Sequence, residues 1–282
     1  MLALIGGSGL YNLEGLELQQ QWDINTPFGQ PSAAISCGVY QGEKILFLPR
    51  HGIAHRLLPH EVNYRANIFA LKQCGASKIF SVSAAGSLRE HIKPGDLALV
   101  SQYFDHTRGR REQTFFGHGI SAHIATANPC CPALSADICA AAKSIDQPLH
   151  RDMTYACVEG PRLGTRAESH FLRSAANADL VGMTNVPEAF LAREAQMAYS
   201  SICLITDYDC WMDDSSQHVS MDQFFATYSD ALSKAQALFN AFISAPQRDT
   251  PADIRTALDN AMLTPPQNMN AEQKQWFDIL CQ

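Results

Sequence analysis

The sequence predicts an α/β fold in which a largely buried β-sheet is flanked by helices. Short apolar runs of the kind that form buried strands recur along the 282 residues, and segments with helical periodicity lie between several of them. The apolar fraction of 46% is ample for the core of a large domain of this class. Continuous apolar runs, rather than alternating ones, are typical of strands that are covered on both faces.

The elements can be placed in order along the chain. Strands are expected at 2–6, 44–49, 78–84, 96–100, 153–158, 179–183 and 199–206. Helices are expected at 61–74, 133–145, 166–176, 187–196 and 219–244. Apolar residues three and four positions apart support the helices, and Pro187 suits a first helical turn. The longest helix has the broadest apolar stripe, which indicates core packing.

A change of composition after residue 246 divides the chain. We expect residues 1–246 to form the α/β domain, because residues 247–282 are rich in Gln, Asn, Asp and Pro. Short helices are expected in this tail, and Asn270 with Gln273 forms a capping pair for one of them. The tail is therefore predicted to be a helical appendage whose role the sequence does not define.

Charge and cysteine content exclude several classes of protein. A net charge of −7 argues against nucleic acid as a partner, because that binding needs a basic surface. No run approaches the roughly 20 apolar residues of a membrane span, and the short apolar run at the N-terminus lacks the basic region of a signal peptide. The nine cysteines are odd in number and have no C-x-x-C spacing. We therefore expect free thiols and a cytoplasmic protein.

Two carboxylates follow the last apolar run of the domain. Asp207 and Asp209 come after Ile202–Ile205, and in an extended backbone residues i and i+2 point to the same side. Carboxylates near a core must be paired, hydrogen-bonded or partly protonated. A pair that both donates and accepts hydrogen bonds suits the N7 and amino edge of an aminopurine. Two solvated turn residues are the alternative.

Small, hydroxyl and basic residues after other apolar runs suggest an anion site. Ser8 lies in a glycine turn, Ser83 closes one run, Thr184 follows another, and Arg50 ends a further run beside His51. An arginine at a strand end suits bidentate binding of phosphate. Because ligands of α/β folds gather at the carboxyl ends of strands, these residues predict a phosphate site. The alternatives are a turn without a ligand, strand-to-loop packing and an exposed arginine.

The histidines of the same region raise a metal site as another alternative. His51, His55 and His60 are close in sequence, but the segment lacks the carboxylate of an H-E-x-x-H motif. Pro59 would also interrupt a helix that aligned the three side chains. No metal is therefore expected.

Short segments spread over roughly residues 2–245 match one known family in the same order. They are Gly6-Gly7-Ser8-Gly9-Leu10, Thr26-Pro27-Phe28-Gly29, Arg50-His51-Gly52, Val62-Asn63-Tyr64-Arg65-Ala66-Asn67, Gly86-Ser87-Leu88-Arg89, Glu159-Gly160-Pro161-Arg162, Arg166-Ala167-Glu168, Met183-Thr184, Val186-Pro187-Glu188 and Thr206–Trp211. In this set the chain resembles the nucleoside phosphorylases of the purine type, and most closely the S-methyl-5'-thioadenosine phosphorylases. Collinearity of this kind is more specific than any one motif.

The resemblance implies a fold, a reaction and an assembly. The fold would be a single nucleoside phosphorylase-like domain with a central mixed β-sheet, in a homotrimer. Phosphate would attack C1' of the ribose, adenine would leave, and 5-methylthioribose 1-phosphate would form. Phosphate is a co-substrate in this reaction, so no cofactor or metal is implied.

The resemblance also implies roles for single residues. Phosphate would be held by Ser8, Arg50, His51, Ser83, Ala84 and Thr184. The ribose would lie against Met183, and the base would meet Asp207 at N7, as the catalytic proton donor, and Asp209 at the 6-amino group. The 5'-methylthio group would be enclosed by Met221, Phe224, Phe225 and His123, the last from the neighbouring subunit.

Two positions depart from the patterns of related enzymes. Leu163 stands where adenine-binding members often carry an aromatic residue, so aliphatic contact with the base replaces stacking. Relatives that bind 6-oxopurines usually have a glutamate at the position of Gly164 and an asparagine at that of Asp207. A carboxylate facing O6 would disfavour hypoxanthine, because mispaired buried polar groups dominate discrimination. Adenine is therefore the expected base.

Other functions remain open on the sequence. A related phosphorylase could act on methylthioinosine or on ordinary purine nucleosides, adenosine included. A hydrolase of the same fold would use water and would not need Arg50. A non-catalytic purine-nucleoside-binding protein would bind its ligand without turnover.

Overall fold

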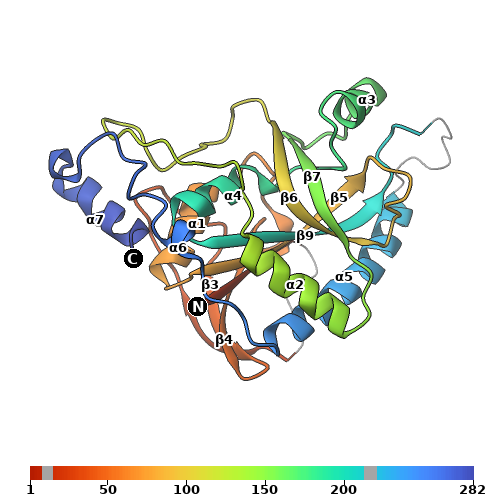
Figure 1. Ribbon diagram of the computed structural model, residues 1–282, viewed down its shortest axis with the longest axis horizontal. Coiled ribbons are helices and arrows are strands. Elements are labelled where there is room, and N and C mark those ends of the chain that lie inside the picture. The colour runs from red at the N-terminus through yellow and green to blue at the C-terminus, as the bar shows by residue number, and fades with distance from the viewer. Residues whose placement is uncertain (8–14, 213–220) are drawn as a thin grey trace.

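A mixed β-sheet forms the centre of the molecule in this computed structural model, which describes residues 1–7, 15–212 and 221–282, without the side chains of 221–226 (Figure 1). Its strands are β1 (Leu2–Gly6), β2 (Glu17–Trp22), β3 (Ile35–Tyr40), β4 (Glu43–Pro49), β5 (Lys78–Ser87), β6 (Leu97–His106), β7 (His150–Val158), β8 (Leu180–Gly182) and β9 (Ala198–Asp207). Their order is β2-β3-β4-β1-β5-β8-β7-β6-β9, and β5 also pairs with β9. That second pairing closes five of the strands into a ring.

Parallel and antiparallel pairs meet on β5. This strand runs parallel to β1 and β9, and β1 runs parallel to β4. The short strand β8 runs antiparallel to β5, and β6 runs antiparallel to β9. The predicted α/β class with a central mixed sheet is confirmed.

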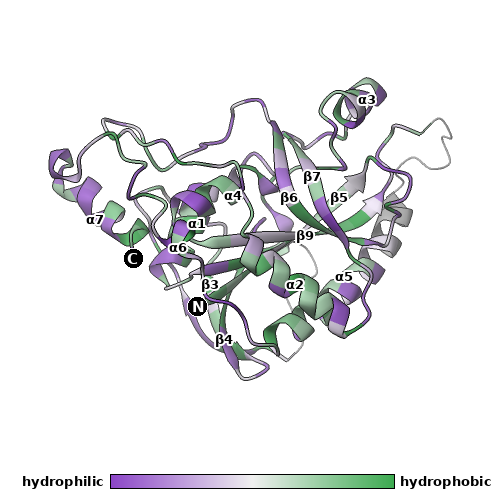
Figure 2. Cartoon of the chain, viewed as in Figure 1, coloured by the Kyte–Doolittle hydropathy of each residue, from purple (hydrophilic) through white to green (hydrophobic). Residues whose placement is uncertain are grey.

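Helices cover both faces of the sheet. One face carries α1 (Tyr64–Gln73) and α4 (Asn185–Glu194), and the other carries α2 (Pro132–Ser144) and α5 (Met221–Ile243) (Figure 1). Side chains of β1 alternate between the two cores: Ala3 and Ile5 pack towards α1 and α4, whereas Leu2 and Leu4 pack towards α2 and α5. Figure 2 shows the corresponding hydrophobic segments along the central strands.

The remaining helices lie towards the ends of the molecule. They are η1 (Ile53–His55), α3 (Arg166–Ser174), α6 (Ala252–Arg255), η3 (Pro266–Asn268) and α7 (Ala271–Leu280). In Figure 1, α3 and α7 stand at opposite ends of the long axis. Within the described part of the chain, no helix has both the length and the apolar character needed to cross a membrane.

The predicted elements are present, and the differences have simple causes. Two strands were not predicted. The strand β2 is exposed along most of its length and carries no apolar run, and the apolar residues of β3 are interrupted by Ser36 and Gly38. The strand β5 continues to Ser87, so Ser83 lies inside it and the predicted strand end at Ser83 is wrong. Asn270 and Gln273 do form a capping box at the start of α7, as predicted.

The tail after residue 246 packs into the same core as the sheet. Trp276 of α7 is buried, and its ring centroid lies 5.6 Å from that of Phe28 and 6.1 Å from that of Phe116. The backbone of the tail also pairs with a distant segment, since the N–H of His123 donates to the carbonyl of Ala261 at 2.8 Å. The tail therefore holds in place the segment that carries His123.

Replacing Trp276 with alanine should lower the free energy of unfolding by about 3–5 kcal/mol, the usual range for a buried Trp or Phe. Trp276 is 7% exposed, whereas Leu263 of the same tail is 64% exposed. Leu263→Ala is therefore the matched control and should change the stability by less than about 0.5 kcal/mol. Denaturant unfolding followed by circular dichroism measures both, and equal losses would show that α7 adds nothing to the cooperative core.

Candidate active site

Asp207 and Asp209 converge on Gly86 at the end of β9. The register between β5 and β9 shifts between Ala85 and Gly86, so that Asp207 pairs with Gly86 across a β-bulge. A Cβ atom on Gly86 would lie 2.8 Å from Oδ1 of Asp207 and 3.3 Å from Cβ of Asp209. Both carboxylates therefore depend on the absence of a side chain at Gly86.

The extended i, i+2 geometry expected for the two aspartates is wrong. Asp209 has a φ of 53°, in the left-handed region, and its N–H donates to Oδ1 of Asp207 at 2.7 Å. The indole N–H of Trp211 donates to the carbonyl of Ser87 at 2.8 Å and holds this turn on β5. A bulge and a tight turn, rather than a straight strand, bring the carboxylates together.

The surroundings of Asp207 favour its protonated form. Burial raises the pKa of Asp207 above its ordinary value, and the charge of Asp209 acts in the same direction. Hydrogen bonds from the Thr206 hydroxyl, at 2.6 Å, and from the Asp209 N–H oppose this shift, but the net pKa is raised. The Asp207 carboxyl group is thus suited to hold a proton and to donate it.

A cavity of about 130 Å³ adjoins Asp209 and is lined in part by Gly160, Gly164 and Val181. No described atom lies within 4 Å of the place where a Cβ on Gly164 would stand. Gly160 packs on Met183, since its Cβ would lie 2.5 Å from the Met183 Sδ. The cavity thus extends from Asp209 to the turn at Gly160, which packs on Met183.

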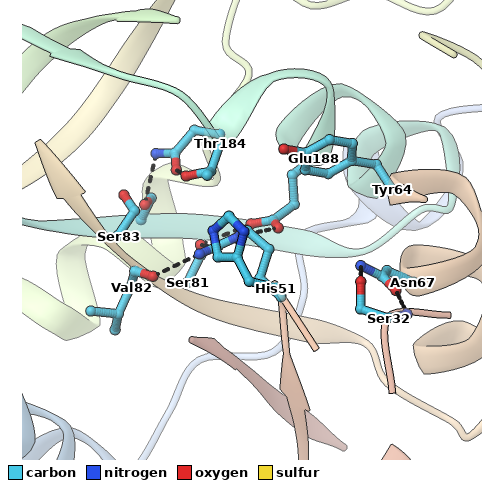
Figure 3. A network of polar contacts seen from close by, with 12 residues as sticks. Ser32, His51, Tyr64, Asn67, Ser81, Val82, Ser83, Thr184 and Glu188 are labelled. Carbon is cyan, nitrogen blue, oxygen red and sulfur yellow. Dashed lines mark hydrogen bonds and ion pairs between the residues drawn. The ribbon is translucent and has the colours of Figure 1, made fainter. Parts of the chain in front are cut away.

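Arg50 is 1% exposed and is not an exposed loop residue. Its side chain contacts Ser81, Val82 and Glu188, which are labelled in the polar network of Figure 3. Its Nε and Nη2 donate to the two carboxylate oxygens of Glu188 at 2.7 and 2.8 Å. Nη1 donates to the carbonyl of Val82 at 2.9 Å, and Nη2 also donates to Oγ of Ser81 at 2.7 Å. Within the described residues, four of the five N–H groups of Arg50 are thus used. Glu188 occupies the Nε–Nη2 edge that a bidentate contact with phosphate would use, so the role of Arg50 towards phosphate stays a prediction.

Glu188 completes this network and was not among the predicted site residues. It is 1% exposed and also accepts hydrogen bonds from Ser81 Oγ at 2.9 Å and from the hydroxyl of Tyr199 at 2.8 Å. Its signal in the sequence was its place in the segment Val186-Pro187-Glu188, one of those that match the family, but no role was assigned to it there. An acidic residue is costly to bury unless it is paired, and the partner lies 138 positions away along the chain.

Ser83 and Thr184 lie on the same side of the network (Figure 3). Because β8 runs antiparallel to β5, with Val181 opposite Gly86, the chain after β8 returns towards the middle of β5. Thr184 is the N-cap of α4 but makes no capping hydrogen bond with its side chain. The Thr184 hydroxyl donates to Oδ1 of Asn185 at 3.5 Å, and Val186 has a φ of -114° and a ψ of 128°, so the regular helix begins only after Val186. The feature beside Ser83 is therefore this turn with its hydroxyl group, not a regular helix N-terminus. Ala84, next to Ser83, is half-buried.

His51 is buried beside Arg50 in a neutral form. Burial lowers the pKa of His51 to about 4, and the neighbouring charge of Arg50 acts in the same direction. Nδ1 lies 2.9 Å from the carbonyl of Leu57, so Nδ1 carries the proton and donates it. The ring of His51 stacks on that of His55 with centroids 4.2 Å apart. The ring therefore brings no positive charge to an anion.

Several predicted residues lie elsewhere. Ser8 and the side chains of Met221, Phe224 and Phe225 lie outside the described residues. Leu163 is 58% exposed, and His123 is exposed on the segment held by the tail. Among the described residues, no group of three or more His, Cys, Asp or Glu is arranged to hold a metal ion.

Comparisons with known proteins define the class of this fold and site. The family model described as the phosphorylase superfamily matches residues 1–244. S-methyl-5'-thioadenosine phosphorylase of Geobacter sulfurreducens is 45% identical over 99% of the chain and 97% of that protein. The enzyme of that name from Thermosynechococcus vestitus is 42% identical over 99% of the chain and 97% of its own length.

Solved structures agree with this assignment. A methylthioadenosine phosphorylase from an antarctic soil metagenomic library superposes with a TM-score of 0.91, at 42% identity, over 99% of this chain and 98% of that one. Methylthioadenosine phosphorylase from Schistosoma mansoni, in complex with adenine, has a TM-score of 0.87 at 30% identity over 93% and 98% of the two chains. The fold and site thus define a nucleoside phosphorylase of the phosphorylase superfamily. Within it, the chain belongs to the family of S-methyl-5'-thioadenosine phosphorylases.

Removing Glu188 alone should destabilise the protein more than removing both members of the buried pair. Glu188→Leu leaves the charge of Arg50 without its partner, which costs about 3–5 kcal/mol in buried pairs. The double variant Arg50→Met with Glu188→Leu leaves no buried charge and should recover part of that loss. Urea unfolding of the two variants tests this, and a double variant no more stable than Glu188→Leu would contradict it.

Proposed function

We propose that the chain catalyses phosphorolysis of S-methyl-5'-thioadenosine to adenine and 5-methylthioribose 1-phosphate. Relatives of this name match nearly its whole length, at 45% and 42% identity. Within the molecule, the proposal rests on the raised pKa of Asp207 and on its contact with Asp209. Such a pair can donate a hydrogen bond to N7 of a purine and accept one from its 6-amino group. The proposed reaction needs no covalent nucleophile from the protein, because phosphate itself attacks C1'.

The chemistry separates charge along the glycosidic bond. Cleavage builds positive charge on the ribose and negative charge on the purine, and the enzyme accelerates it by stabilising both in the transition state. A protonated Asp207 donates to N7 of the leaving adenine, and Asp209 accepts from the 6-amino group. Phosphate lies below the ribose, stabilises its positive charge and attacks C1'. Met183, packed against Gly160, lies against the ribose.

The phosphate side is built from donors of different kinds. The hydroxyls of Ser83 and Thr184, which lie on the same side of the network, and Nη1 of Arg50 support this assignment. Ser8 and Ala84 complete the proposed set. His51 would act through its backbone N–H, because its ring is neutral and its Nδ1 proton is donated to Leu57.

The base is adenine in this proposal. Gly164 brings no side-chain carboxylate to accept the N1–H of a 6-oxopurine, and the carboxylate of Asp209 would face O6. Leu163 stands where adenine-binding relatives often carry an aromatic residue, and its aliphatic side chain would contact the base. The 5'-methylthio group would lie among Met221, Phe224 and Phe225, with His123 of a neighbouring subunit.

That last contact assumes a homotrimer. The exposure of His123 on its own chain supports a role at a subunit boundary. We also assign the enzyme to the cytoplasm, because all nine cysteines are free thiols.

A substrate panel with and without phosphate tests the proposed function. Adenine should be released from S-methyl-5'-thioadenosine only when phosphate is present, and the rate on methylthioinosine should be far lower. Release without phosphate would indicate a hydrolase, and tight binding without turnover would indicate a binding protein. Equal rates on the two nucleosides would overturn the base assignment.

Asp207→Asn should lower kcat/KM for the adenine nucleoside by about 100-fold or more, as expected for a general acid. It should also shift relative preference towards 6-oxopurines, because an amide has two N–H donors for O6 and N7, whereas the carboxyl group of Asp207 has at most one proton to donate. In the native enzyme, activity should fall as pH rises through the raised pKa of Asp207, since only the protonated form donates. This alkaline limb should be absent in Asp207→Asn. An unchanged base preference would mean that another residue sets it.

A further inference from the structure

Arg111 lies on the segment between β6 and α2 and belongs to none of the sequence segments that match the family. It is nevertheless buried, at 5% exposure. Its guanidinium reaches three separate parts of the chain. Nε donates to Oε1 of Glu159 at 3.0 Å, and Nη2 donates to the carbonyls of Val158 and Glu159 at 3.3 and 2.9 Å. Nη1 donates to the carbonyl of Val186 at 2.6 Å and to the hydroxyl of Tyr64 at 3.4 Å.

These contacts use all five N–H groups of the side chain. Arg111 therefore has no donor left for a substrate, and any effect on the reaction must act through the groups it holds. The carboxylate of Glu159 is satisfied as well, because its second oxygen accepts the N–H of Arg108 at 2.7 Å. Burial alone would raise the pKa of Glu159, but the hydrogen bonds from Arg108 and Arg111 keep this pKa below its ordinary value. Glu159 and Arg111 therefore form a charged pair.

The groups held by Arg111 stand on either side of the substrate-binding residues. Glu159 precedes Gly160, the residue that packs on the Met183 Sδ. Val186 is in the first turn of α4, two residues after Thr184. One rigid, planar side chain thus sets the separation between the end of β7 and the start of α4, and the pair Met183-Thr184 spans the gap.

We propose that Arg111 is the positioning residue for the ribose and phosphate contacts of this site, through Gly160–Met183 on one side and the start of α4 on the other. This inference rests on the proposed function. A lysine cannot replace the arginine, because three N–H groups on one nitrogen cannot reach the Glu159 carboxylate and the carbonyls of both segments together.

The test compares Arg111→Lys with Arg193→Lys. Arg193 is also largely buried, at 14% side-chain exposure, and pairs with Asp253 at 3.4 Å, but it lies at the far end of α4. In Arg111→Lys the KM values for phosphate and for the nucleoside should both rise, and kcat/KM should fall about 10- to 100-fold. Arg193→Lys should stay within about twofold of the native enzyme in all three constants.

The KM values separate positioning from a loss of folding, because KM does not depend on the fraction of enzyme that is folded. Native KM values in Arg111→Lys, with only a lower melting temperature, would overturn the proposal. Should Arg111→Lys not fold, Glu159→Gln weakens the same tie from the other partner. Raised KM values for both substrates in Glu159→Gln would support the proposal, and native values would overturn it.

Failure of the proposed function would be visible separately. Native enzyme that releases no adenine with phosphate would refute phosphorolysis without addressing Arg111. Thermal shifts with phosphate and adenine then decide the role of Arg111. Both ligands should raise the melting temperature of the native protein and of Arg193→Lys but not of Arg111→Lys, and equal shifts in all three would overturn the proposal.

Discussion

The buried ion pair between Arg50 and Glu188 is the interaction on which the rest of the site depends. It joins the end of β4 to α4, and through Ser81 and Tyr199 it also binds β5 and β9. An unpaired charge in this position would be costly, so the four elements are held in one arrangement. That arrangement brings the N-terminus of α4, with Thr184, to the interior of β5. The pair therefore fixes the architecture of the proposed phosphate side.

The site has two halves with opposite electrostatic character. On one half the hydroxyl groups of Ser83 and Thr184 and Nη1 of Arg50 are suited to an anion. On the other half Asp207 and Asp209 crowd around Gly86, and burial keeps the pKa of Asp207 raised. This polarity matches a reaction in which phosphate approaches one side of a ribose while a purine leaves with its electrons on the other. Met183 lies between the halves, and the proposed tie through Arg111 would keep their separation constant.

Much of the fold and part of the site could be predicted from the sequence, for local reasons. Buried strands are recognisable in the sequence as apolar runs. The start of α7 is recognisable from Asn270 and Gln273, a capping pair only three positions apart. The exposed strand β2 has no such signal, so it was missed. Glu188 was missed for a different reason: nothing local distinguishes a buried acid from an exposed one when its partner is distant in sequence.

By itself, the sequence determined the α/β class, the family through its ordered motifs, and the presence of Asp207 and Asp209 after a buried strand. Only the tertiary structure decided how those residues meet. A β-bulge and a left-handed turn, not an extended strand, place both aspartates at Gly86. The antiparallel course of β8 brings Thr184 towards the middle of β5, and long-range pairing turns Arg50 inward to Glu188. These outcomes depend on contacts between residues far apart along the chain, and such contacts leave no periodicity or spacing from which they could be read.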